Sequence, residues 1–175
     1  DYDEAADAAE KLTRLAPDDP ASWHQLGHAL LTWGRPKEAE AALKKSNDLD
    51  PTILDVWRSL TVARGLQNKL KLAESTAFEA TELFPDDPLN WENLGISRYK
   101  QSYFERSEQA FLQAIHNGSA TPDIWLNIGN SRKALGNFYQ AEYAFVSATE
   151  LDGSVAVCWS LLGSVRLALK KYNGA

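Results

Sequence analysis

The chain has 175 residues, of which 44% are hydrophobic and 24% charged, and its formal net charge is −6. This composition is ordinary for a soluble protein. The sequence contains no run of about 20 apolar residues, the length that a membrane-spanning helix needs. The acidic balance argues against non-specific nucleic-acid binding, which needs a clustered basic surface. The single cysteine, Cys158, excludes an intrachain disulfide.

The tryptophans give the chain its organisation, because five of the six recur every 34 residues: Trp23, Trp57, Trp91, Trp125 and Trp159. A fixed period of this size predicts a stacked array of one supersecondary unit. Residues 1–19 are expected to be the second helix of a partial repeat, and residues 156–175 the first helix of another. Between them the period defines four complete repeats: 20–53, 54–87, 88–121 and 122–155.

Helix boundaries are predicted from residues that commonly begin or end helices. An aspartate followed by proline predicts an N-cap and a first helical residue at Asp19-Pro20 and at Asp87-Pro88. Gly34 and Gly136 are expected to separate the two helices within a pair. Proline ends three second helices: Pro17, Pro51 and Pro85. No segment alternates with period 2, so we expect about ten helices and no strand.

Small residues recur with the tryptophan. With the tryptophan taken as position 4, position 7 is Leu or Ile, and position 8 is Gly27, Thr61, Gly95, Gly129 and Gly163. Position 20 is Ala39, Ala73, Ser107, Ala141 and Ala175. Small residues at these spacings suit close helix–helix contact. The pattern resembles the tetratricopeptide repeat, W-x-x-L-G…A-x-x-x-F…P, over essentially the whole chain.

The resemblance implies an all-α, right-handed α-solenoid of antiparallel helix pairs. In this family the first helices line a concave groove that binds peptides. The groove positions that we single out are His24, Gln25, His28, Arg58, Asn93, Asn127, Asn130 and Lys133. The same positions also give Asp55, Glu92 and Asp123. Amides can pair with a peptide backbone, and basic side chains with its carboxylates.

Two ligand patterns of the family can be compared with these residues. Asn93 and Asn127 share a repeat position, which resembles the peptide-holding asparagine ladder of O-linked N-acetylglucosamine transferases. Chaperone-binding members use a Lys…Asn…Asn…Lys…Arg clamp for a terminal carboxylate, and this sequence does not meet that pattern. His24 and His28 have the spacing of a zinc-chelating pair, but no third ligand is evident, so we expect neither metal nor cofactor.

Two further series recur at fixed positions. Position 11 of the repeat is an arginine in four units: Arg64, Arg98, Arg132 and Arg166. Position 21 is a glutamate in four units: Glu40, Glu74, Glu108 and Glu142. We interpret them as structural ion pairs that join the two helices of each hairpin. The alternative is an arginine stripe for anionic ligands.

The sequence therefore predicts a protein-interaction scaffold or adaptor that binds a peptide or partner segment, with no enzymatic motif of its own. One alternative is the regulatory or substrate-selecting array of a larger enzyme, such as a glycosyltransferase. Another is a self-assembling homo-oligomeric scaffold. Because the chain starts within a repeat and lacks methionine, we expect a fragment whose parent continues past Ala175, and exposed ends that favour self-association. The compartment is not assigned by any motif, and the cytoplasm is the default expectation.

Overall fold

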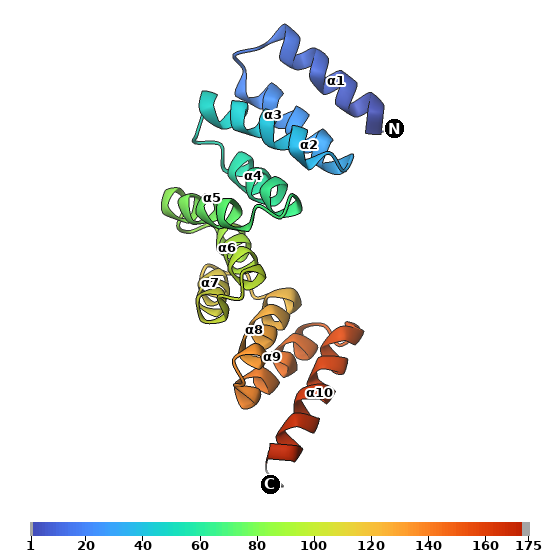
Figure 1. Cartoon of the computed structure of the whole chain (residues 1–175), viewed down its shortest axis with the longest axis vertical. Helices are drawn as coiled ribbons and strands as arrows, with labels where there is room; N and C mark the ends of the chain where they lie inside the picture. Colours follow the sequence, from blue (N-terminus) through green and yellow to red (C-terminus); the bar gives the residue numbers. More distant parts are fainter. Residues whose placement is uncertain (1, 173–175) are drawn as a thin grey trace. The chain divides into compact units, whose positions relative to one another are not determined.

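The computed structural model describes residues 2–172, with side chains from residue 3 to residue 170. This part of the chain contains α-helices and no strand (Figure 1). The ten helices are α1 (Tyr2–Leu15), α2 (Pro20–Thr32), α3 (Pro36–Leu49), α4 (Leu54–Leu66), α5 (Leu70–Leu83), α6 (Pro88–Lys100), α7 (Phe104–His116), α8 (Pro122–Ala134), α9 (Phe138–Leu151) and α10 (Ala156–Tyr172). None of the described helices is long and apolar enough to cross a bilayer. The all-α class expected from the sequence is confirmed.

The helix starts have the predicted caps. The carboxylate of Asp19 accepts hydrogen bonds from the backbone N–H groups of Ala21 and Ser22, and Pro20 occupies the first turn of α2. Asp87 accepts from the N–H of Asn90 at the start of α6. These bonds satisfy N–H groups that have no partner within the helix. Helix α8 has the same device, with a threonine in place of the aspartate.

The turns between paired helices require left-handed backbone. Gly34 has a φ of 80° and Gly136 a φ of 79°, a region that glycine enters without steric cost. Asn68 and Ser102 take the corresponding place in the other two complete pairs, with φ values of 59° and 62°. Asparagine tolerates this conformation better than most residues. The glycine turns predicted at residues 34 and 136 are therefore confirmed.

The chain divides into two compact units, Asp1–Pro85 and Asp86–Ala175. In the first unit, each of α1 to α4 packs on the next helix along the chain, and α2 also contacts α4. Its core includes Ala39, Leu43 and Leu60, which are almost completely buried. The indole N–H of Trp57 donates to the carbonyl of Pro51 over 2.7 Å, and Trp23 donates to Pro17 over 2.8 Å. The recurrent tryptophan therefore also closes the turn that precedes its helix.

In the second unit, α6 to α10 pack in the same way, and α6 also contacts α8. The space at the repeated glycine is filled by the next helix. A Cβ atom built on Gly129 would lie 2.5 Å from the ring of Phe145, and one built on Gly95 would lie 2.7 Å from Phe111. Both phenylalanines are fully buried. The close approach expected at this position is confirmed, and it stacks the two helices of each pair.

The arginine–glutamate series pairs differently from our expectation. Arg132 on α8 binds Glu108 on α7 over 2.8 Å, so it joins two consecutive pairs and not the helices of one hairpin. Arg64 binds Glu40 in the same way over 3.1 Å, and Arg166 binds Glu142 over 2.6 Å. The expected partner within the hairpin was wrong because α8 packs against both α7 and α9, and the glutamate that Arg132 reaches is on α7. The second arm of Arg132 instead donates to the backbone carbonyl of Gln140 on α9 over 3.1 Å.

Candidate partner-binding groove

In the first unit, three of the predicted groove residues lie together on α2. His24, Gln25 and His28 line a hollow of about 410 Å³. The remaining lining residues are Ala5, Ala29 and Thr32. Ala5 comes from α1, so our rule that only first helices line the groove missed it. His24 is half-buried, whereas Gln25 and His28 are exposed.

Arg58, the fourth predicted residue of this unit, does not line that hollow. It lies on α4, where its guanidinium pairs with Asp55 over 2.8 Å. Asp55 is close enough to α2 to act on the charge of His24. Burial lowers the pKa of His24, the field of Asp55 raises it, and His28 lowers it again, with a net decrease. His24 is therefore neutral at pH 7 and offers both a hydrogen-bond donor and an acceptor.

In the second unit, the three predicted asparagines lie half-buried on the first helices α6 and α8. The side chains of Asn93, Asn127 and Asn130 make no hydrogen bond with another described residue, although each amide carries donors and an acceptor. The two helices that carry these asparagines are in contact within the unit. An amide that is half-buried and has no protein partner can accept a ligand without first breaking a bond.

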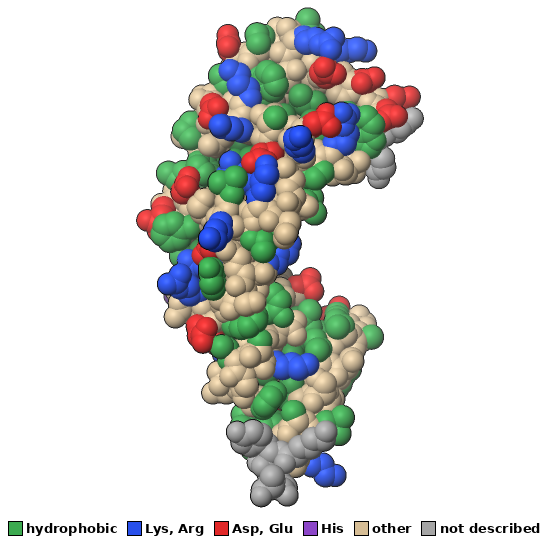
Figure 2. Space-filling view, in the orientation of Figure 1, with side chains coloured by type: hydrophobic (Ala, Val, Ile, Leu, Met, Phe, Trp, Pro, Cys, Tyr) green, Lys and Arg blue, Asp and Glu red, His purple; other side chains and the backbone are tan. Residues whose placement is uncertain are grey.

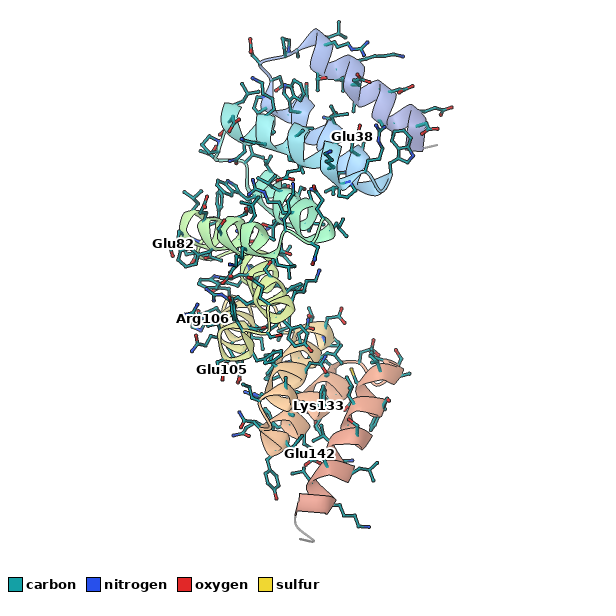
Figure 3. All side chains as sticks on the ribbon, viewed as in Figure 1. Glu38, Glu82, Glu105, Arg106, Lys133 and Glu142 are labelled. Atoms are coloured by element: carbon teal, nitrogen blue, oxygen red, sulfur yellow. The ribbon has the colours of Figure 1, made fainter. Side chains whose placement is uncertain are left out.

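Lys133 lies near the C-terminal end of α8 and extends toward α10 (Figure 3). Its ammonium group donates to the hydroxyl of Ser164 over 3.2 Å. An ammonium has three donors, so two remain for a ligand. No carboxylate of the described residues forms an ion pair with Lys133, and its positive charge therefore faces the surface uncompensated.

The opposite ends of α6 and α8 carry acidic side chains. Glu92 is half-buried in the first turns of α6, and Asp123 lies in the first turn of α8. Burial raises the pKa of Glu92, and the negative charge of Asp123 raises it further. The surface of this unit therefore has carboxylates at the N-terminal ends of its first helices, amides along their middle and an ammonium group at the C-terminal end.

Metal binding by His24 and His28 would need a third ligand close to them. Among the described residues, no three His, Cys, Asp or Glu side chains are grouped so that they could hold an ion. The pair at positions 24 and 28 is therefore assigned only to the lining of the first-unit hollow.

Residues 20–53 match the family model of the tetratricopeptide repeat. A comparison with curated protein sequences gave no match. Among solved structures, the crystal structure of MamA is 22% identical with a TM-score of 0.82, over 89% of this chain and 91% of that one.

Two further solved structures resemble the chain over most of its length. TTC0263, a thermophilic tetratricopeptide-repeat protein of Thermus thermophilus, is 19% identical with a TM-score of 0.74, over 95% of this chain and 91% of that one. YrrB, described as a tetratricopeptide-repeat protein with an unusual peptide-binding site, is 16% identical with a TM-score of 0.78, over 95% and 86%. Residues 20–53 thus match the tetratricopeptide repeat, and the chain has the all-α helix-pair fold of the solved tetratricopeptide-repeat structures.

Proposed function

We propose that the chain is a protein-interaction scaffold whose first helices hold an extended segment of a partner protein. The observation that carries the proposal is the set of half-buried amides of Asn93, Asn127 and Asn130, which make no hydrogen bond within the described residues. A peptide backbone offers the N–H and C=O groups that such amides need.

The charges at the ends of this surface suggest what the segment carries. Lys133 favours an acidic group on the partner, because its ammonium faces no carboxylate of the described residues. Glu92 and Asp123 favour a basic group at the other end. We therefore propose a segment with an acidic and a basic residue separated by several residues. In the first unit, His24, Gln25, His28 and Arg58 would contact a further part of the partner.

The fold supports the same class of function. Tetratricopeptide-repeat proteins are in general interaction scaffolds and not enzymes, and we assign no reaction to this chain. YrrB, a structural neighbour, is a tetratricopeptide-repeat protein with an unusual peptide-binding site. This property of a neighbour supports peptide binding as the kind of interaction to test here.

The test is a selection of peptides from a displayed random library against the intact chain. The affinity of the enriched peptide is then measured for the chain, for the Asn127→Ala/Asn130→Ala variant and for Gln113→Ala, an exposed control on the second helix α7. Loss of two hydrogen bonds of about 0.5–1.5 kcal/mol each should weaken binding roughly tenfold. Equal affinity of the folded double variant and the control would overturn the assignment of these asparagines.

Self-association is the second candidate, and one observation favours it. Helix α10 exposes Val157, Trp159 and Leu167, which are 49%, 52% and 66% accessible. Figure 2 shows hydrophobic side chains at the surface of this helix. Exposed apolar patches commonly mark association sites. If α10 associates with a second copy, the mass in sedimentation equilibrium should rise with concentration, and Leu167→Lys should abolish the rise. A mass that stays monomeric at high concentration would contradict this candidate.

A further inference from the structure

The junction between α1 and the first complete helix pair differs from the other junctions. The 34-residue period places Ala6 and Leu30 where the next junction has Glu40 and Arg64. Glu40 and Arg64 form an ion pair, and two junctions of the second unit have the same pair. Alanine and leucine cannot form it, and both are buried, with 5% and 6% of their surface exposed. The α1–α2 junction therefore has an apolar contact where these three described junctions have a charged one.

A space lined by α1, α2 and α3 lies at this junction. A cavity of about 400 Å³ opens beside Ala6 and Leu30, with further apolar lining from Leu26 and Ala42. The side chains of Trp23 and Trp33 also line it. Its volume falls in the range of small-ligand pockets, which are mostly apolar with a few polar groups at defined places.

Trp33 and Arg35 adopt a different arrangement from their counterparts one repeat later. There, Gln67 donates to Glu40 over 2.8 Å and Lys69 pairs with it over 2.6 Å, so both side chains contact the carboxylate of that junction. No carboxylate exists at residue 6. Arg35 lies instead over the ring of Trp33, with its guanidinium carbon 4.3 Å from the ring centroid, and its Nε donates to Glu38 over 2.7 Å. The cavity therefore stays open, and its tryptophan already stacks against one cation of the chain.

The rim of the cavity is acidic. Asp7 and Glu10 of α1, Glu38 of α3 and Arg35 all line the cavity, and Figure 3 labels Glu38. Figure 2 shows both acidic and basic side chains along α1. The lining thus has three carboxylates and one guanidinium. Glu10 pairs with Arg14 over 2.8 Å and Glu38 pairs with Arg35, so Asp7 is the lining carboxylate that forms no ion pair with another described residue. An apolar cavity with such a rim and two indole rings favours a positively charged ligand, because a cation is attracted both by the carboxylates and by aromatic faces.

We propose that this cavity is a second binding site that accepts an apolar group carrying a positive charge. It shares no residue with the groove hollow. Trp23, Leu26 and Leu30 lie on the opposite side of α2 from His24 and His28, as their spacing in a helix requires. The ligand's apolar body contacts Leu30 and the tryptophans, and its cationic head meets Asp7 and Glu10. The site does not depend on the groove proposal.

Two sources present this chemistry, a free aromatic amine and an aromatic side chain flanked by lysines in a protein. The probes are tryptamine, its anionic counterpart indole-3-propionate, and an acetylated Gly-Lys-Trp-Lys-Gly amide peptide. Binding is followed by the indole N–H resonances of the ¹⁵N-labelled chain, in which Trp23 and Trp33 report on the cavity and Trp57 and Trp159 serve as internal controls. If the peptide binds more tightly than tryptamine, the natural ligand is assigned as a protein segment. If tryptamine binds more tightly, it is assigned as a small molecule.

The decisive variant introduces at this junction the glutamate–arginine ion pair that three other junctions contain. Ala6→Glu/Leu30→Arg should keep the fold, because three other junctions already contain this pair, and it should abolish the Trp23 and Trp33 shifts. Asp7→Asn/Glu10→Gln changes only exposed rim residues and should reduce the preference for tryptamine over indole-3-propionate by at least about tenfold, the effect of 1.4 kcal/mol. The proposal is overturned by equal binding of cation and anion to the unaltered chain, by binding that survives in a folded Ala6→Glu/Leu30→Arg variant, or by no shift with any probe.

Discussion

Arg132 and Glu108 form an ion pair 2.8 Å long between consecutive helix pairs, and only 15% and 21% of their side chains are exposed. If one partner of a partly buried ion pair is removed, the other charge stays desolvated without compensation, and this destabilises the fold. Arg166 and Glu142 form the equivalent pair with 57% and 28% of their side chains exposed. The two pairs therefore have the same residues and register but different burial.

Their difference in burial predicts different contributions to stability. Glu108→Gln should lower the free energy of unfolding by about 1–3 kcal/mol, because it leaves Arg132 without its charged partner. Glu142→Gln should lower it by less than about 1 kcal/mol, as exposed pairs do. Urea unfolding of both variants measures the two values. Equal effects would show that burial does not determine the strength of this series.

The repeated glycine gives a second matched comparison. Gly129→Ala places a Cβ atom 2.5 Å from Phe145 and should destabilise the chain by about 1–3 kcal/mol through overpacking. Gly163 has the same repeat position, but nothing lies within 4 Å of its added Cβ. Gly163→Ala should stabilise α10 by about 0.5–1 kcal/mol, since alanine favours helix more than glycine does. Thermal unfolding should therefore shift in opposite directions, and a decrease for both variants would contradict the account.

Glu40 predicts a pH dependence of stability. Its burial raises the pKa, but hydrogen bonds from Lys69, Gln67 and Arg64 outweigh it, so the pKa lies below its usual value of 4.5. A carboxyl whose folded pKa is depressed stabilises the fold above the unfolded pKa and loses this contribution as the pH falls through the folded pKa. Glu40→Gln should therefore be less stable than the unaltered chain at pH 7, and the difference should shrink below pH 4.5. A difference that is constant with pH would exclude this role for the carboxylate.

Cys158 provides a chemical probe of the second unit. Its thiol is 1% exposed, and burial raises its pKa, as do the charges of Asp123 and Asp152. The thiolate is the reactive form, so labelling of the folded chain by iodoacetamide at about pH 7.5 should be much slower than labelling in urea. The rate in native buffer then measures local opening of α10. Equal rates in buffer and in urea would mean that the helix is not packed as described.

Local chemistry explains which features of the fold were predictable. Asp19, Asp87 and Gly34 each need only their immediate neighbours to define a cap or a turn, and all three were predicted correctly. The glycine at position 8 was also predictable, because a gap on one helical face requires a close neighbour. The division of the chain into repeats at residues 20–53, 54–87, 88–121 and 122–155 stays a prediction.

Features that depend on which helix lies where were harder to predict. The partner of Arg132 was wrong because the spacing of arginines and glutamates fits both the hairpin and the junction before it, and only packing distinguishes the two. The cavity beside Leu30 had a sequence signal, namely Ala6 and Leu30 in place of a glutamate and an arginine. That signal becomes informative only once the glutamate and arginine are known to meet. The groove assignments of His24 to Lys133 stay predictions that require a ligand.

Site-specific photocrosslinking tests the proposed interaction surface most directly. The photoreactive residue p-benzoylphenylalanine replaces Asn130 on the first helix α8 in one version of the chain and Gln113 on the second helix α7 in another. Both are irradiated in a cell lysate, and adducts are identified by mass spectrometry. The account predicts a partner protein crosslinked at residue 130 and not at residue 113. Adducts at residue 113 with none at residue 130 would contradict binding along the first helices.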